Sequence, residues 1–203
     1  MAEMRFSKAE MLEVFERRDA AYRLAIIASH WIRDHRTFKP TSVDEARGMF
    51  MEVDDQWIDF MDIAAELERD PSALSGELVM NQLHTTIRAS FEVLRNYCED
   101  YDALIGTASQ RPMLENANWY VYAVAVRNAV SHNFRFRFRG DFRKRLPTTW
   151  NGMTITADMD GKPLEPGTFW HRQGYALFLA MHAFAKTLPA PPAETKERSA
   201  KGS

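Results

Sequence analysis

The stretch "MLENANWYVYAVAVRNAVSHNF", residues 113–134, has a pattern that fits two different structures, and the predicted fold depends on which of them it forms. Its aromatic and β-branched residues favour a strand, whereas its length favours a buried helix. In a helix, Asn128 and His132 are four residues apart and lie on one face, with Arg127 beside them. In a strand, Arg127 and His132 would point to opposite faces, because they are five residues apart. A site shared by these side chains therefore requires the helix.

Three helices are predicted before this stretch. Ser7 and Glu10 have the spacing of a capping box, in which each side chain satisfies a free backbone N–H of the other residue, so a helix should begin there and extend to about His35. A second helix is predicted over residues 42–70 and a third over residues 77–104, both from apolar residues at steps of three and four. The stripe of the second helix consists of Ala46, Phe50, Val53, Trp57, Phe60, Ala64 and Leu67.

Beyond residue 133 the pattern changes to a period of two, which only a strand places on separate faces. The alternating residues are Phe134, Phe136 and Phe138 with Arg135, Arg137 and Arg139. Residues 153–164 are predicted to form a second strand with a turn at Asp160–Gly161. A last helix is predicted over residues 169–188. The tail, residues 189–203, is Pro-rich and then polar and is predicted to be disordered.

Together these elements predict a mainly α fold, an up-and-down helical bundle with a small β-hairpin insertion before the last helix. The hairpin is expected at about residues 133–165. With 203 residues, of which 45% are hydrophobic and 12% aromatic, the chain can bury a sizeable core. We expect residues 1–188 to form a single domain.

Charge is segregated along the chain, although the net charge is only −2. This balance excludes a general basic surface for nucleic acid, so any such surface must be local. Residues 44–70 are strongly acidic and residues 127–145 strongly basic. Two solvated faces would explain this pattern. The acidic segment could also repel or bind a basic partner, such as a protein that neutralises this one.

Several classes of protein and site are disfavoured. The single cysteine, Cys98, rules out an intrachain disulfide and fits a reducing cytoplasm. The start of the chain lacks the apolar stretch of a signal peptide, and no apolar run approaches the length that spans a bilayer. We therefore expect a cytoplasmic protein without a membrane partner. No phosphate-binding Gly-rich loop, Gly-x-Ser-x-Gly turn or metal-ligand spacing occurs, so neither a cofactor nor a metal is expected.

Arg127, Asn128 and His132 supply chemistry suited to RNA cleavage without a metal. Arginine is a permanent cation whose planar fork matches phosphate oxygens. Histidine moves protons near neutral pH, and asparagine can hold an imidazole or a sugar hydroxyl by hydrogen bonds. One cluster lacks a second group to protonate the leaving 5′-oxygen. A symmetric homodimer would supply it from the partner's copy.

The segment "RNAVSH", residues 127–132, resembles the signature of the HEPN superfamily, in which an Arg and a polar residue are followed a few positions later by His. Arg127, Asn128 and His132 are the matching positions. The resemblance implies an all-helical domain and a dimer with the paired motifs in its cleft. It also implies, for many members, a metal-independent endoribonuclease that acts as a toxin, in antiphage defence or in RNA processing.

The basic residues after the motif are predicted to bind RNA. Alternate side chains of a strand stand about 6–7 Å apart, comparable with the spacing of backbone phosphates. These residues are Arg135, Arg137, Arg139, Arg143, Lys144 and Arg145. An edge strand protected from aggregation by its charges is the alternative. The sequence thus predicts an RNA-cleaving enzyme. A non-catalytic module that binds RNA or protein and a helical interaction protein remain as alternatives.

Overall fold

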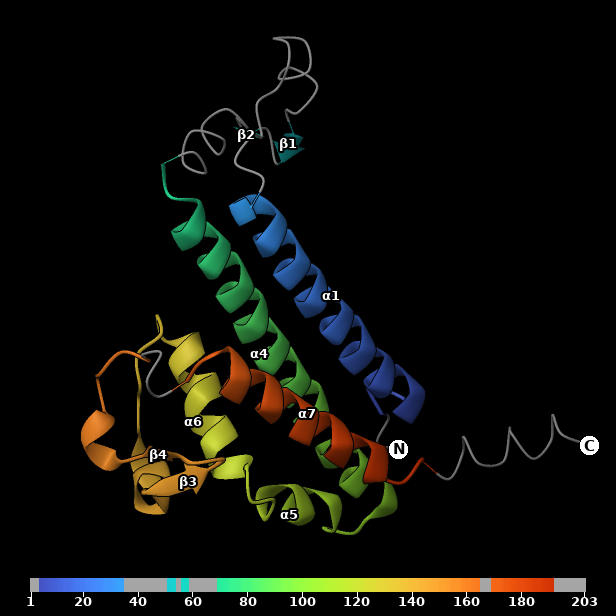
Figure 1. The fold of residues 1–203 in the computed structure, drawn as a ribbon. Helices are drawn as coiled ribbons and strands as arrows, with labels where there is room; N and C mark the ends of the chain where they lie inside the picture. Colours follow the sequence, from blue (N-terminus) through green and yellow to red (C-terminus); the bar gives the residue numbers. More distant parts are fainter. Residues whose placement is uncertain (1–3, 35–50, 54–55, 59–68, 165–168, 192–203) are drawn as a thin grey trace, which may run out of the picture. The chain divides into compact units, whose positions relative to one another are not determined.

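The computed structural model describes residues 4–34, 51–53, 56–58, 69–164 and 169–191 (Figure 1). The chain divides into two compact units: unit 1 comprises residues 1–20 and 83–203, and unit 2 comprises residues 21–82. Within the described part, the protein is mainly helical, with a two-stranded hairpin before the last helix, as predicted. The single domain over residues 1–188 stays a prediction. The "RNAVSH" motif, the basic segment and the hairpin all belong to unit 1.

Helix α1, Lys8–Asp34, begins with the predicted capping box. The Ser7 N–H donates to Glu10 Oε2 at 2.8 Å, and the Glu10 N–H donates to Ser7 Oγ at 3.1 Å. Each bond satisfies a backbone donor that the first helical turn leaves free. The predicted start is confirmed, and the helix continues as far as the described residues reach, to Asp34. The predicted end at about His35 lies outside the described residues.

The helix predicted over residues 42–70 is wrong for residues 51–53 and 56–58. Strands β1, Met51–Val53, and β2, Gln56–Ile58, pair antiparallel, with Met51 opposite Ile58. Val53, Trp57 and Ile58 are β-branched or aromatic residues, which fit a strand as well as a helix. Residues 42–50, 54–55 and 59–68 of this prediction lie outside the described residues.

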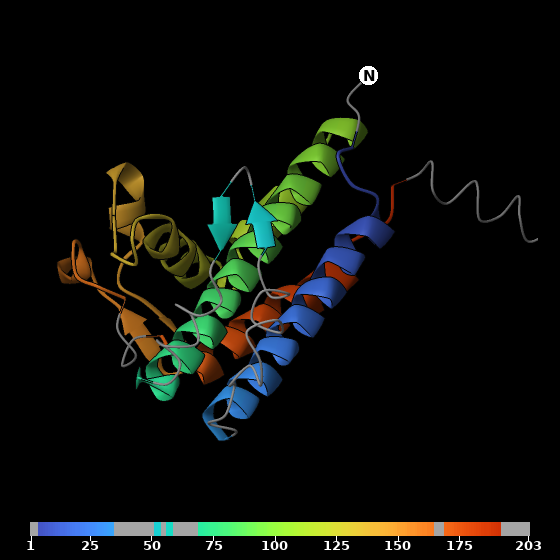
Figure 2. The same ribbon diagram turned by 90° about the horizontal axis from the view of Figure 1, so that it is seen from above.

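Helix α4, Pro71–Ile105, contains the third predicted helix but begins six residues earlier. The Asp70 carboxylate caps its start by accepting from the Ala73 N–H at 2.9 Å, and Pro71 occupies the first helical position. Both residues are favoured there, because the cap satisfies a free donor and proline has no N–H to leave unsatisfied. In unit 2, the start of α4 lies beside the C-terminal part of α1 in both views (Figures 1 and 2).

Two helices replace the single one predicted over residues 113–132. α5 spans Gln110–Glu115 and α6 spans Tyr120–Ser131. In the break between them, the Ala117 N–H donates to the Leu114 carbonyl and the Tyr120 N–H donates to the Ala117 carbonyl. The opening stretch is nevertheless helical where it carries Arg127 and Asn128.

The predicted hairpin exists, and its second strand falls within the predicted residues 153–164, but its first strand is a different one. β3, Thr148–Trp150, pairs antiparallel with β4, Met153–Ile155. Asn151 and Gly152 make the turn with φ of 50° and 78°, the left-handed geometry that suits an Asn–Gly turn between strands. Trp150 packs on Tyr122 of α6 with ring centroids 5.7 Å apart, which anchors the hairpin beside α6 (Figure 1).

Residues 135–139 follow the turn at Phe134 and form only one isolated bridge, between Arg135 and Pro163. The Phe136 N–H donates to the Lys162 carbonyl at 2.9 Å, and Gly161 occupies the predicted turn with φ of 81°. Phe136 and Phe138 are buried, whereas the neighbouring arginines are exposed. The two-face alternation is therefore confirmed for Phe136 and Phe138, but Phe134 is exposed and the regular strand does not form.

Helix α7, His171–Thr187, closes unit 1 by packing on α1 and α4. Phe178 contacts Phe15 with centroids 5.7 Å apart, and the Tyr175 hydroxyl donates to Asp19 at 2.8 Å. The chain after α7 remains packed as far as Pro191, which is buried, and the Pro189 carbonyl accepts from the Tyr97 hydroxyl at 2.7 Å. The tail prediction is thus wrong for residues 189–191, and residues 192–203 lie outside the described part.

The core of unit 1 is built mainly from α4, α6 and α7. Its largest fully buried side chains are those of Tyr97, Tyr122, Phe15, Phe136, Phe169, Phe178, Met11, Leu83, Ile87, Leu94, Leu114 and Ile155. Cys98 is also fully buried, and this burial raises the pKa of its thiol to about 12. A thiol held neutral in this way is an inert core residue. Among the described helices, none combines the length and the apolar character needed to cross a bilayer.

Candidate functional site

Helix α6 places Arg127 and Asn128 on its outward side. Tyr122, Ala123, Ala125, Val126 and Ala129 are buried, so the helix is fixed by its apolar face. Arg127 retains 26% of its side-chain exposure. The burial of the neighbouring positions thus leaves a guanidinium at the edge of the core, reachable from solvent at one side.

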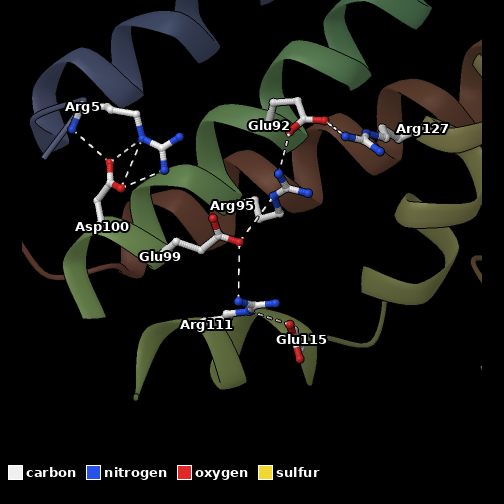
Figure 3. Close-up of polar contacts among 8 residues, drawn as sticks. All are labelled: Arg5, Glu92, Arg95, Glu99, Asp100, Arg111, Glu115 and Arg127. Atoms are coloured by element: carbon white, nitrogen blue, oxygen red, sulfur yellow. Dashed lines mark hydrogen bonds and ion pairs between the residues drawn. The ribbon is translucent and has the colours of Figure 1, made fainter. Parts of the chain in front are cut away.

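Arg127 is held by two acceptors. Its Nη2 group donates to a carboxylate oxygen of Glu92 on α4 (Figure 3). Its Nη1 group donates to Asn128 Oδ1 at 2.8 Å. Its buried Nε has no hydrogen-bond partner among the described residues. Burial, followed by the positive charge of Arg88, lowers the pKa of the guanidinium.

His132 is the first residue after α6 and lies outside its helical register. Its φ and ψ are −125° and 53°, and its N–H donates to the Ala129 carbonyl at 3.0 Å. Asn133 and Phe134 follow with φ of 55° and 56°, so the chain turns sharply there. The His132 ring is exposed and makes no hydrogen bond, ion pair or ring contact with any described residue. Its imidazole is therefore open to a ligand.

The predicted pairing of Asn128 with His132 is absent from the described contacts. The Asn128 oxygen accepts from Arg127 instead. Because His132 is no longer helical, the four-residue spacing does not stack the two side chains. Asn128 thus positions the guanidinium and leaves the imidazole without an orienting group in the described part of the chain.

The six predicted RNA-binding residues are all exposed, but they fall into two sets. Three have intramolecular partners. Arg135 donates to the Gly161 carbonyl at 3.1 Å, and Lys144 pairs with Asp141 at 2.6 Å. Arg145 donates to the Glu115 carbonyl at 3.3 Å and lies 5.4 Å from the centre of the Tyr120 ring.

Arg137, Arg139 and Arg143 form the second set. None of their side chains makes a hydrogen bond or an ion pair with a described residue. Arg137 and Arg139 project from the extended segment whose phenylalanines enter the core, and Arg143 lies in the short 3₁₀ helix Gly140–Arg145. These three cations are available to bind an external anion.

A chain of alternating charges continues from Arg127 along α4 to α5 (Figure 3). Arg95 lies 3.5 Å from Glu92 and 3.6 Å from Glu99, and Arg111 lies 3.7 Å from Glu99 and 2.9 Å from Glu115. Ion pairs this exposed stabilise a fold little, by about 0–1 kcal/mol each. They matter for the site because they pair the carboxylates of Glu92 and Glu99 with arginines.

Sequence reasoning missed Glu92 and Arg88, the α4 residues nearest Arg127. Their spacing of four on a predicted helix was visible in the sequence. What the sequence does not give is that Arg127, 35 positions further along, packs against that face. The residues join the site through tertiary packing alone.

His84 occupies a core position, whereas His171 at the start of α7 is only partly buried. The His84 ring is buried and packs on Phe134 at 4.6 Å and Phe169 at 6.0 Å. Burial, with a smaller effect of His171, lowers the pKa of His84 to about 4. Neither ring nitrogen of His84 has a hydrogen-bond partner among the described residues. His84 is thus an apolar packing residue at neutral pH.

No group of three or more His, Cys, Asp or Glu side chains that could hold a metal ion occurs in the described ranges. No protein-family model matches the sequence, and no curated protein or solved structure is significantly similar to it.

Proposed function

We propose that this protein is a HEPN-like, metal-independent endoribonuclease. The observation that carries the proposal is that a half-buried Arg127 lies in the last turns of α6 and His132 directly follows the helix. The His132 side chain is exposed and has no partner among the described residues. Arg137, Arg139 and Arg143 add cations on the segment that follows. A phosphate-binding group and a proton-transfer group beside a cationic segment are what cleavage of an RNA backbone needs.

Each residue of the motif has a role in the proposed reaction. Arg127 binds the non-bridging oxygens of the scissile phosphate and stabilises their growing charge. Asn128 holds the guanidinium in place through its 2.8 Å hydrogen bond. His132 removes the proton of the 2′-hydroxyl as its oxygen attacks phosphorus in line. The bond from phosphorus to the 5′-oxygen breaks, which leaves a 2′,3′-cyclic phosphate and a 5′-hydroxyl.

The leaving 5′-oxygen needs a proton from a second group. In the proposed homodimer, His132 of the second copy donates this proton, so each reaction uses two imidazoles in opposite protonation states. The biological role we propose is that of a toxin or phage-defence effector, restrained in the cell by a neutralising partner protein.

A non-catalytic HEPN-like module that binds RNA or protein is the second candidate. One observation favours it: both terminal nitrogens of Arg127 already donate to protein acceptors, Glu92 and Asn128. A guanidinium engaged in this way could be structural. The exposed arginines Arg137, Arg139 and Arg143 would then bind the backbone of an RNA that is never cut.

The test is incubation of the wild-type protein with labelled total RNA in EDTA. The proposal predicts new fragments that carry 5′-hydroxyl ends and 2′,3′-cyclic phosphates. Salt-sensitive binding without new ends would favour the binding module instead. Cleavage that EDTA abolishes would contradict the metal-independent route.

A further inference from the structure

Three residues of α4 form a row along one side of the helix: His84, Arg88 and Glu92. They are spaced by four, so consecutive members lie one turn apart, with their Cβ atoms about 5–6 Å from each other. The two ends of the row have defined contacts. Glu92 accepts from Arg127, and His84 packs on Phe134 at 4.6 Å.

These contacts fix where Arg88 lies. Arg127 and Phe134 are on either side of the end of α6, and His132 lies between them in sequence. Since Arg88 is the middle member of the row, it lies alongside the last turn of α6 and the turn that follows it. The effect of its charge on the Arg127 guanidinium agrees with this placement, because the positive charge of Arg88 lowers the Arg127 pKa.

Among the described residues, the exposed Arg88 side chain makes no hydrogen bond or ion pair. Glu92, the carboxylate one turn away, pairs with Arg127 and with Arg95. Arg95 pairs in turn with Glu99. Glu92 is thus already shared by two other guanidiniums, so Arg88 adds positive charge to this region that an anion would neutralise.

We propose that Arg88 is a second phosphate-binding residue of the site, which holds the RNA backbone together with Arg127. This inference rests on the proposed function, because it names a further contact to the same substrate. It assigns α4 a direct part in binding RNA. The motif on α6 and the arginines that follow it would then bind one strand jointly with α4.

The experiment compares the affinities of four single variants for a single-stranded RNA that is 2′-O-methylated throughout, so that binding is measured without cleavage. The variants are Arg88→Ala, Arg88→Lys, Arg127→Ala and, as a matched control, Arg17→Ala. Arg17 is an exposed arginine of α1 that pairs only with Glu13, at 2.5 Å, among the described residues. Fluorescence anisotropy over a series of salt concentrations gives each dissociation constant and its salt dependence.

Arg88→Ala is expected to weaken binding about tenfold at low salt, as for loss of one charged hydrogen bond. It should also reduce the slope of log K against log salt by about 0.7, the value for one phosphate contact on a single strand. Arg88→Lys should retain most of the affinity and the full slope, and Arg17→Ala should bind like the wild type.

The outcomes separate the two proposals. If Arg127→Ala weakens binding while Arg88→Ala behaves like Arg17→Ala, the Arg88 assignment is overturned and the proposed function stands. If the wild-type protein binds no RNA at any salt concentration, the proposed function fails and the Arg88 assignment fails with it. Equal thermal melting curves for all variants establish that the differences come from binding.

Discussion

Arg127 donates from both of its terminal nitrogens to protein acceptors, so a phosphate must share the guanidinium with Glu92 or displace it. This competition is the central residue-scale feature of the site. Glu92 orients the guanidinium, and its negative charge repels a phosphate in the same place. The two effects have opposite signs, and a substitution that removes only the charge separates them.

Glu92→Gln retains an oxygen that can accept from Arg127 but removes the negative charge. We predict that its affinity for RNA rises about threefold, since a unit charge about 6 Å from a phosphate contributes roughly 0.6–1 kcal/mol at near-aqueous dielectric. Anisotropy with uncleavable RNA at low salt measures this change. A loss of affinity as large as that of Arg127→Ala would mean that the charge of Glu92 is needed to position the guanidinium.

His84 provides a residue-scale test of the packing that supports the turn after α6. Its pKa is about 4 in the folded protein because the ring is buried, against about 6.5 in an unfolded chain. Between these values the unfolded state binds more protons, so the free energy of unfolding decreases as pH falls through the window from 6.5 to 4. We predict a loss of about 3 kcal/mol from this residue by pH 4.

The measurement is urea unfolding at several pH values for the wild type and for His84→Phe, whose ring fills similar space and does not titrate. Because His171 and His182 also have lowered pKa values, the decisive quantity is the difference between the two proteins. The variant should lose less stability than the wild type below pH 6.5. Parallel curves for the two proteins would show that His84 does not titrate from a buried site.

At the scale of elements, α4 and α7 approach closely at Gly174. A Cβ built on Gly174 would lie 2.5 Å from Leu83 Cδ2 and 2.7 Å from Phe169 Cζ. Gly174→Ala should therefore destabilise the fold by about 1–3 kcal/mol through overpacking. Gly76→Ala on α4 is the matched control, since nothing lies within 4 Å of its Cβ position, and it should stabilise by about 0.5–1 kcal/mol. Denaturant unfolding that gave both variants the same sign would contradict this packing.

The sequence predicted α1, α4 and α7 from their apolar spacing, with a capping box at the start of α1. The same kind of spacing over residues 42–70 did not exclude strands at 51–53 and 56–58. The first strand of the hairpin was predicted in the wrong place, because the Phe/Arg alternation reports which side chains are buried, not which backbone groups pair. Asn151–Gly152 was the available signal for the real turn. The break between α5 and α6, residues 116–119, contains no Gly or Pro from which it could have been predicted.

Only some residues of the candidate site could be predicted from the sequence. Arg127, Asn128 and His132 could be found because they lie within six residues of each other. Glu92 and Arg88 could not, since their place beside Arg127 depends on how α4 packs against α6. The helical stacking of Asn128 with His132 was expected from spacing, but the helix ends at Ser131 and the stacking does not occur.

At the scale of the whole molecule, the proposed reaction needs two imidazoles, and each chain offers one in this site. We predict that the active protein is a homodimer with twice the 23.4 kDa mass of the chain. Light scattering at the protein concentration used for cleavage measures this mass. A monomer that cleaves RNA at full rate would require a second proton donor from within the chain and would contradict the two-fold arrangement.

The most direct test of the central claim is the single-turnover rate of RNA cleavage in EDTA for the wild type, for His132→Ala and for His30→Ala. His30 is an exposed histidine of α1 outside the proposed site. The account predicts that His132→Ala lowers the rate at least about a hundredfold, the usual contribution of a general acid or base, while the His30 variant cleaves at the wild-type rate. Equal rates for all three proteins would contradict it.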